Sequence, residues 1–231
     1  MRLSYTLIAI LLLSTIISCE VENGIQEIEL TLETLPFDRI RLESSSDVRI
    51  IQSDNHRVII SGLERDVNDV EVRVIDDRLT IEENGNQSSD LLIKVYVPEI
   101  SDLESTGSSL VYGESFFTQN RNMDIRLTGS GEIDFAIDTD DLDVELTGSG
   151  YVYLEGNVQT LDADLSGSGW LRSFSLESDH ADVRIEGSGS TELTVVTDLD
   201  VFITGSGDVF YKGHPGINAQ ITGSGSLIDS N

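Results

Sequence analysis

The sequence contains one cysteine, Cys19, in 231 residues, and it has only three prolines and one tryptophan. A single cysteine excludes intramolecular disulfides, so stability has to come from buried apolar side chains and paired backbone groups. No stretch carries apolar residues at helical spacing, which argues against an α-helical fold. The chain is therefore expected to be built from strands.

Basic residues are also scarce. Lysine and arginine number 14 against 42 aspartates and glutamates, which gives a formal net charge of −28 at pH 7. Nucleic acid is excluded as a partner because phosphate binding requires a basic surface, and an anionic membrane surface would repel the chain. Partners are expected to be neutral, cationic or bridged by metal ions. The alternative is that the surface acids only keep the protein soluble and protect sheet edges.

Recognisable catalytic motifs are missing as well. The three histidines, His56, His180 and His214, are scattered and show no metal-binding spacing. No Gly-x-Ser-x-Gly motif is present, and Ser130 and its equivalents lie in Gly-Ser-Gly turns without a neighbouring histidine pattern. Pairs of acids such as Asp140-Asp141 abound, but 42 acids produce such pairs by chance. The sequence thus predicts a protein that is not an enzyme and that needs no cofactor.

What the sequence has in abundance is a glycine repeat. The sequence Gly129-Ser130-Gly131 returns in five later copies, and Thr106-Gly107-Ser108-Ser109 is a worn copy that precedes it. The first glycines of the seven copies are Gly107, Gly129, Gly148, Gly167, Gly187, Gly205 and Gly223. A fixed period, here about 19 residues, is the signature of a repeat architecture.

Apolar residues alternate around each copy. Met123, Ile125 and Leu127 precede Gly129 at even spacings, and Ile133 follows it at an even spacing. The other copies repeat this pattern, and period 2 is typical of β-strands. Each unit is therefore expected to be a strand, a glycine corner and a second strand. Because about 19 residues are too few for a strand-helix-strand unit, the repeat predicts a parallel β-solenoid of about 19-residue coils with Gly-Ser-Gly corners.

The two glycines of each copy have a structural explanation. Parity places both on the inward side of the coil, next to large aliphatic residues, where a Cβ atom would find no room. A sharp corner also favours a positive φ. A phosphate-binding loop would instead have one such turn before a helix.

Residues 1–18 are expected to be a signal peptide. Arg2 supplies its positive end, and Tyr5 to Ile17 form an apolar run that is shorter than the ~20 residues of a membrane-spanning helix. The following Ser18-Cys19 ends a sequence that looks like a bacterial lipobox, which predicts lipidation of Cys19. Residues 19–35 would then be an acidic tether of an outer-membrane lipoprotein in the cell envelope, facing the surface or the periplasm. The alternative is an ordinary signal peptide that is cleaved elsewhere.

Residues 36–231 are interpreted as one β-solenoid domain. Before the glycine repeat, shorter strands are expected at Arg39 to Leu42, Asp47 to Ile51, Arg57 to Ile60, Val70 to Val74, Leu79 to Glu82 and Leu91 to Val97. This half is less regular, and no proline- or glycine-rich linker separates it from the repeat. It is therefore interpreted as the atypical, capping end of the solenoid. A separate β-subdomain over residues 36–105 is the alternative.

The Thr/Ser-Gly-Ser-Gly copies and the ending Gly205 to Pro215, followed by Ile217 to Ser226, carry a family resemblance. With looser agreement over Phe37 to Ile51 and Val70 to Ile81, the chain resembles the auto-transporter adhesin head GIN domain family, common among lipoproteins and secreted proteins of Bacteroidetes. The resemblance covers about residues 36 to 229. It implies a right-handed parallel β-helix-like fold, and it brings no established activity and no catalytic residues.

An outward-facing aspartate recurs before the first glycine of successive copies. The set is Asp124, Asp143, Asp162, Asp182 and Asp200, and Asn218 ends it. In stacked coils these carboxylates would lie roughly 5 Å apart, and each like-charged neighbour costs on the order of 1 kcal/mol in water. Ca²⁺ ions that bridge the column would remove that cost. The alternative is turn chemistry, in which each aspartate bonds to nearby backbone and salt screens the repulsion.

Aromatic side chains mark a second outward surface. Tyr151 and Trp170 occupy equivalent positions after the glycines of adjacent copies, and Tyr153 and Arg172 occupy the next outward position. Parity places all four on one face as a flat patch, with Phe210 further along the same track. Such a patch suits stacking on glycan rings or contact with a surface protein. An ordinary cross-strand ladder without a ligand is the alternative.

These features favour a non-enzymatic, lipid-anchored protein of the cell envelope whose solenoid presents a surface for adhesion or for binding of polymers and glycans. Two other classes stay open at this stage. A polysaccharide lyase or hydrolase would use acids on the same face, since parallel β-helices host such enzymes although fold does not decide function. A purely structural component of the envelope is the third class.

Overall fold

The computed structural model describes residues 13–14, 21–22, 25–84, 91–118 and 122–231. Cys19 and nearly all of the expected signal peptide lie outside the described residues. Within the described part strands dominate, and the only helix is the short α1 (Glu64–Asn68). No helix in this part is long and apolar enough to cross a membrane.

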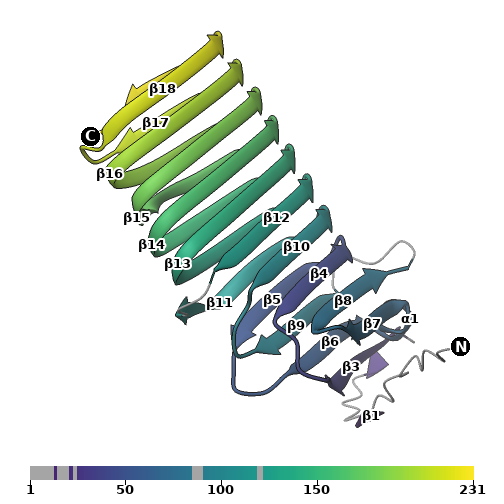
Figure 1. Ribbon diagram of the computed structural model, residues 1–231. Helices are drawn as coiled ribbons and strands as arrows, with labels where there is room; N and C mark the ends of the chain where they lie inside the picture. Colours follow the sequence, from purple (N-terminus) through teal and green to yellow (C-terminus); the bar gives the residue numbers. More distant parts are fainter. Residues whose placement is uncertain (1–12, 15–20, 23–24, 85–90, 119–121) are drawn as a thin grey trace, which may run out of the picture.

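From residue 102 onward the chain is a stack of parallel strands (Figure 1). The strands are β10 (Asp102–Gly107), β11 (Leu110–Thr118), β12 (Met123–Gly129), β13 (Glu132–Gly148), β14 (Tyr151–Gly167), β15 (Trp170–Gly187), β16 (Ser190–Gly205), β17 (Asp208–Lys212), β18 (Gly216–Gly223) and β19 (Ser226–Asp229). They pair in register, so the first glycines form one column from Gly107 to Gly223. The expected β-solenoid with about 19-residue coils is confirmed.

Each coil has two outer faces, one on each side of its glycine corner. The first part of β13 pairs with β11, whereas its last part pairs with β12. The strand therefore turns from one face to the other between Asp138 and Leu142, where its pairing passes from β11 to β12. Side chains at even offsets from the first glycine of their copy point inward, and among them Leu127, Ile133 and Val144 are at most 2 % exposed. These side chains belong to one continuous hydrophobic core. The residues at odd offsets on both faces are therefore left for solvent and partners.

Stacking of one corner on the next explains the glycines. Gly148 has a φ of +121°, and a Cβ at this residue would lie 2.4 Å from the carbonyl oxygen of Gly129 in the coil beneath. A Cβ at Gly150 would lie 2.7 Å from both the Gly131 carbonyl oxygen and Leu127 Cδ2. The second glycine thus meets the interior as expected. The positive φ expected at the corner is found at the first glycine, but the expected aliphatic neighbour is not, because what excludes a Cβ there is the carbonyl oxygen of the neighbouring coil.

The first half of the chain does not stack in sequence order. Its strands are β1 (Leu13–Ser14), β2 (Val21–Glu22), β3 (Ile25–Glu33), β4 (Arg39–Ser44), β5 (Asp47–Gln52), β6 (Arg57–Leu63), β7 (Val70–Ile75), β8 (Arg78–Glu83) and β9 (Leu92–Val97). β4 lies between β8 and β10, and β5 lies between β9 and β11. The chain therefore makes the coil β4–β5 first, then the coil beneath it, β8–β9, and returns above both to β10–β11.

Antiparallel strands cover the end of the stack formed by β8 and β9. β7 pairs antiparallel with β8, β6 with β9, and β3 with β6. The backbone edge that a bare coil would expose is thereby hydrogen-bonded, which prevents uncontrolled pairing with another chain. The strands expected before the glycine repeat are confirmed as β4 to β9, whereas α1 was not expected.

Strand β3 corrects part of the tether prediction. Residues 25–33 fall inside the stretch 19–35 that was interpreted as a tether, yet they form a strand paired with β6. The physical reason is the alternation of Ile28, Leu30 and Leu32, whose side chains pack against the core of the cap, Leu32 at 3 % exposure. This alternation was visible in the sequence.

Candidate binding surface

The aromatic patch consists of Tyr151 and Tyr153 on β14 and Trp170 and Arg172 on β15. The register places Tyr151 beside Trp170 and Tyr153 beside Arg172. The two tyrosine rings stack with centroids 6.3 Å apart and an angle of 19° between their planes. The guanidinium carbon of Arg172 lies 5.1 Å from the Trp170 ring centroid and 5.7 Å from that of Tyr153. The structure therefore brings together all four side chains that the sequence singled out.

Phe210 of β17 extends the aromatic patch by two coils. Its ring stacks on Trp170 with a centroid distance of 6.2 Å and an interplanar angle of 14°. The intervening coil places Ser190 beside Trp170 and Glu192 beside Arg172. Because Ser190 is small, the indole can lean across it and reach the phenyl ring. Three coil steps separate the levels of Tyr151 and Phe210, which is a length of ~14 Å at the usual strand spacing.

Acidic side chains lie before the aromatic patch and again between Arg172 and Phe210. Glu132 and Asp134 lie beside Tyr151 and Tyr153 on the preceding coil, while Glu192 and Asp208 lie on the coils that follow. Tyr151 is 39 % exposed, and Arg172 is exposed as well. The patch is therefore an open, flat strip of rings with one guanidinium and carboxylates at its rim. Rings of this kind stack on flat apolar groups, and the rim accepts hydrogen bonds.

The aspartate column lies on the other face of the coils. The register places Asp124, Asp143, Asp162, Asp182 and Asp200 side by side, as expected from their spacing. The structure adds Asp102, which pairs in register with Asp124. Asp102 was not among the aspartates expected from the repeat, because its coil carries the worn copy. Its position five residues before Gly107 was the signal that would have identified it.

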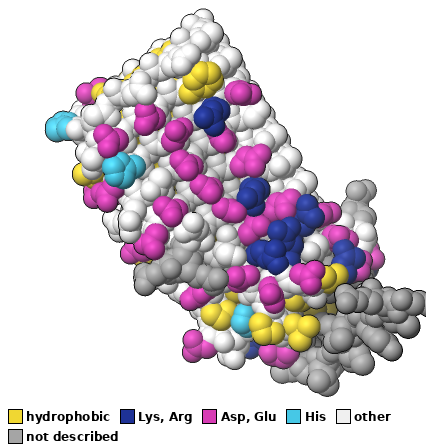
Figure 2. Space-filling view, in the orientation of Figure 1, with side chains coloured by type: hydrophobic (Ala, Val, Ile, Leu, Met, Phe, Trp, Pro, Cys, Tyr) yellow, Lys and Arg dark blue, Asp and Glu magenta, His cyan; other side chains and the backbone are white. Residues whose placement is uncertain are grey.

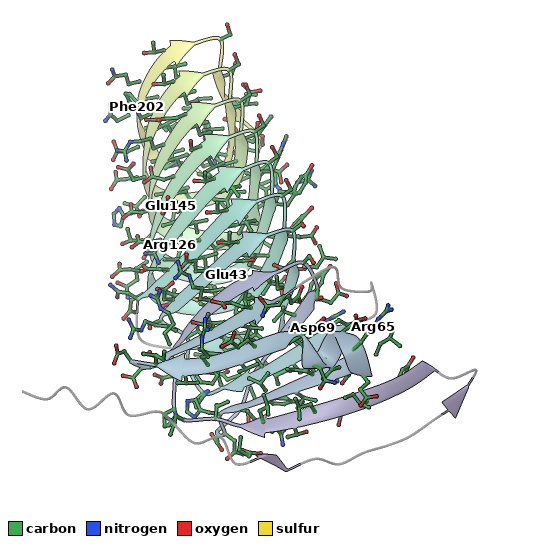
Figure 3. All side chains as sticks on the ribbon, turned by 90° about the vertical axis from the view of Figure 1, so that its right-hand side faces the viewer. Glu43, Arg65, Asp69, Arg126, Glu145 and Phe202 are labelled. Atoms are coloured by element: carbon green, nitrogen blue, oxygen red, sulfur yellow. The ribbon has the colours of Figure 1, made fainter. Side chains whose placement is uncertain are left out.

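Arginines form hydrogen-bonded ion pairs with the aspartates at the N-terminal end of the aspartate column. Arg126 donates hydrogen bonds to Asp102 at 3.0 Å and to Asp124 at 2.8 Å, and Arg78 donates to Asp102 at 2.9 Å. Figure 2 shows several basic side chains gathered in one area of the visible face and bordered by acidic ones, while another basic side chain stands apart near the upper end. In Figure 3, Arg126 and Glu145 project from the same side of the stack. Their ion pair, at 3.7 Å, links the basic area to the acidic coils.

Further along the aspartate column the carboxylates repel one another. Partial desolvation raises the pKa of the Asp143 carboxyl, and the charges of Asp124 and Asp162 raise that pKa further. Desolvation also raises the pKa of Asp182, an effect that Arg184 opposes and that Asp162 and Asp200 reinforce. Both groups are thus easier to protonate than a free aspartate.

The expected metal site is not preformed in this column. In the ranges that the structure describes, no group of three or more His, Cys, Asp or Glu side chains is close enough together to hold a metal ion. Successive carboxylates project from separate coils. Calcium binding at Asp124 to Asp200 stays a prediction, and it would require these side chains to converge.

The histidines do not come together. The imidazole of His180 lies 3.1 Å from an Asp198 carboxylate oxygen at the surface. His56 bonds to the carbonyl oxygen of Phe37 through Nε2, at 3.0 Å, and His214 bonds to the carbonyl oxygen of Gly213. Each histidine thus has its own local partner, and none of these contacts pairs a base with a serine nucleophile.

Comparison with protein families identifies the fold's relatives. The family model described as "Putative auto-transporter adhesin, head GIN domain" matches residues 36–215. The chain belongs to the head GIN domain family. Among curated proteins none matches the sequence.

Solved structures share the fold of this chain. A "putative adhesin" from Bacteroides fragilis has a TM-score of 0.82 at 22% identity, covering 88% of this chain and 96% of that one. A "putative lipid binding protein" from Parabacteroides distasonis has a TM-score of 0.74 at 25% identity, covering 90% and 98%. A "putative adhesin" from Parabacteroides merdae has a TM-score of 0.69 at 18% identity, covering 90% and 98%.

The head GIN domain match includes both candidate surfaces. It spans the aromatic patch and the aspartate column from Asp102 to Asp200, but it ends at residue 215, before the last coil β18–β19. The resemblance expected to continue to residue 229 thus stops one coil earlier in the family model.

Proposed function

We propose that this head GIN domain is a non-enzymatic adhesion module of the cell surface that binds neutral glycan chains along its aromatic patch. The observation that supports this is the stacking of Tyr151 on Tyr153 within one coil and of Trp170 on Phe210 across two coil steps. Such a strip matches a linear polymer of flat rings better than a compact ligand, because it is long, open and free of an enclosing wall. The adhesin descriptions of the family and of two solved relatives agree with this proposal.

Charge selects the class of glycan. The chain carries a net charge of −28, and acids border the aromatic patch. Anionic polysaccharides would be repelled, whereas hydroxyl groups of a neutral glycan can donate hydrogen bonds to the bordering carboxylates. Arg172, which lies over three rings of the patch, supplies donors in the middle of the strip. Each sugar ring that stacks on an aromatic side chain buries apolar surface that water would otherwise contact. This binding requires no chemical reaction.

The test is a binding screen of the purified chain against soluble neutral and acidic polysaccharides. Trp170→Ala should weaken binding of a neutral glycan by about 30-fold, the effect of removing one hot-spot side chain. Phe202→Ala is the matched control, because Phe202 is a half-buried aromatic residue of the opposite face. Unchanged binding by the Trp170→Ala variant, with the melting temperatures of both variants alike, would refute the role of the patch.

The same screen separates binding from degradation. An enzyme would release reducing ends or unsaturated sugars from at least one polysaccharide, whereas a binding module retains the polymer intact. Sustained release of sugars by the wild-type chain would overturn the non-enzymatic proposal.

We further propose that Cys19 carries the lipid that holds the module at the outer membrane. The support is the sequence that precedes it, together with its being the single cysteine. Several acyl chains on one residue anchor a protein stably where one chain does not. Cys19→Ser should release the chain from washed membranes into the soluble fraction, and retention of that variant in the membranes would contradict the anchor.

A further inference from the structure

The two ends of the solenoid are finished differently. β6 and β7 cover the outer edges of β9 and β8 by antiparallel pairing. At the other end, in the part of the chain that the structure describes, β18 pairs only with β16 and β19 only with β17. Figure 1 shows β18 as the outermost strand of this end. One row of backbone N–H and C=O groups of β18 is therefore available for pairing.

The core side chains of β18 are uncovered. Ile217 is 44 % exposed and Ile221 is 39 % exposed. Their in-register neighbours on the coil beneath, Leu199 and Ile203, are at most 1 % exposed because β18 covers them. The two isoleucines thus occupy positions that every earlier coil buries, and one more strand would bury them in the same way.

Charge is absent from β18. Its residues Gly216–Gly223 include no acidic or basic side chain, although the chain as a whole carries a net charge of −28. The outward residue Asn218 stands in register with Asp200, at the end of the aspartate column. Exposed edges are usually protected by charged residues that prevent pairing. Here the column of like charges ends one coil before the free edge, so the electrostatic barrier to a second strand is lowered where that strand would pair.

We propose that β18 is a docking edge for β18 of a second copy of this chain. A twofold axis brings two identical strands together in opposite directions, which gives an antiparallel pair. Centred on Ala219, the pair places Ile217 of each copy opposite Ile221 of the other and Asn218 opposite Gln220. Opposed residues in an antiparallel pair point to the same face, so the isoleucines join the core and the amides stay outside.

A second copy fits this edge better than a charged partner does. Across the rest of the surface two copies repel, because each is strongly acidic. The uncharged β18 permits approach at this one place, and its apolar residues are self-complementary about Ala219. The product is a doubled rod with an antiparallel cap at each far end.

The first experiment is a disulfide trap with the full chain in its host cells. Ala219→Cys places a thiol opposite itself across the twofold axis, where two Cβ atoms lie within disulfide range. After mild oxidation, a nonreducing gel should show a dimer at twice the mass of the monomer seen on a reducing gel. Ile217→Cys should give no such band because its twofold mate lies several residues away, and the wild type controls for linkage through Cys19. Equal bands from both cysteine variants, no band, or only a band of another mass would overturn the proposal.

Charge exchange then tests the pairing itself. Asn218→Lys with Gln220→Lys, and separately Asn218→Asp with Gln220→Asp, oppose like charges across the axis. Either double variant, in the Ala219→Cys background, should form at least about tenfold less dimer. When differently tagged lysine and aspartate variants are made in the same cells, the mixed dimer should return to the level of Ala219→Cys alone, because opposite charges then face each other. Failure of the mixture to restore the dimer would refute this register, and that result would leave glycan binding by the aromatic patch unaffected.

Discussion

The first coils, β4–β5 and β8–β9, and the regular coils that follow belong to one hydrogen-bonded stack of strands, but they form their corners differently. At the corner after β4, Ser44 stands in register with Gly107 and has no positive φ. The backbone N–H of the next residue, Ser45, donates to a Glu83 carboxylate oxygen at 2.9 Å. In a regular corner the equivalent donor, Ser149, bonds to the carbonyl oxygen of Gly129 in the coil beneath. Glycine is therefore required where one corner rests on the backbone of another, and not by the turn alone.

The worn copy of the repeat is a transition between the two kinds of corner. Ser109 replaces the second glycine, and Ser105 stands where the regular coils have leucine or isoleucine. Both serines are fully buried, and their hydroxyl oxygens are 2.7 Å apart. The two substitutions compensate for each other. A smaller inward residue makes room for the added side chain at the corner, and each hydroxyl satisfies the other.

The largest effect is expected from alanine at a stacked corner. Gly148→Ala should lower the free energy of unfolding by about 3 kcal/mol or more, because a positive φ and a contact with the Gly129 carbonyl oxygen must both be relieved. Ser44→Ala, the matched variant of the unstacked corner, should be neutral or slightly stabilising, because the buried Ser44 hydroxyl has no hydrogen-bond partner among the residues that the structure describes. Urea unfolding of both variants measures the difference. Similar losses at the two sites would remove the distinction between stacked and unstacked corners.

A smaller effect is expected at the transition corner. Ser105→Leu installs the regular residue and should cost about 1–3 kcal/mol, since it crowds Ser109 and leaves that hydroxyl unpaired. Adding Ser109→Gly completes the regular pattern and should recover most of the loss. The double-mutant cycle gives the coupling free energy from thermal or urea unfolding. Additive losses would show that the two serines do not compensate for each other.

The smallest effect concerns the acidic stretch of the aspartate column. Asp143 has a raised pKa in the folded state, so protonation favours folding, and this contribution is lost as the pH rises through the folded pKa. Asp143→Asn should therefore stabilise the protein at pH 7 by less than about 1 kcal/mol, as solvent screens an exposed charge. The gain should shrink as the pH falls toward the ordinary aspartate pKa. Asp164→Asn breaks an exposed ion pair with Arg184 at 3.1 Å and should instead destabilise slightly.

Melting temperatures measured over a pH series test whether Asp143→Asn stabilises the protein at pH 7 and loses this effect at acidic pH. A gain from Asp143→Asn that persists unchanged at acidic pH would mean that repulsion is not its cause. The same assay with added Ca²⁺ tests the calcium prediction for Asp124 to Asp200. A rise in melting temperature beyond that of an ionic-strength control would support bridging ions, and its absence would leave turn chemistry as the reason for the aspartates.

Much of the architecture followed from spacing. The recurrence of Gly129-Ser130-Gly131 and the apolar alternation around it predicted the solenoid, the register and the neighbours Tyr151 and Trp170. Repetition makes such prediction possible, because residues at equal offsets must stack once one coil lies on the next. The missed residues lie where the repeat is interrupted. Asp102 belongs to the worn copy, and β3 lies before the repeat, where no periodic spacing marks its partner strand.

The sequence by itself determined the local rules of this protein: strand periodicity, glycine at stacked corners, an acidic column and an outward row of aromatic residues. These rules depend only on offsets within a coil. The tertiary structure alone decided the order of the first coils, the antiparallel cap and the meeting of Trp170 with Phe210 across Ser190. It also showed that Arg78 and Arg126 pair with the first two members of the aspartate column, Asp102 and Asp124, and that β18 is left uncovered. Such contacts join residues whose separation follows no repeat, so they emerge only when the chain has packed.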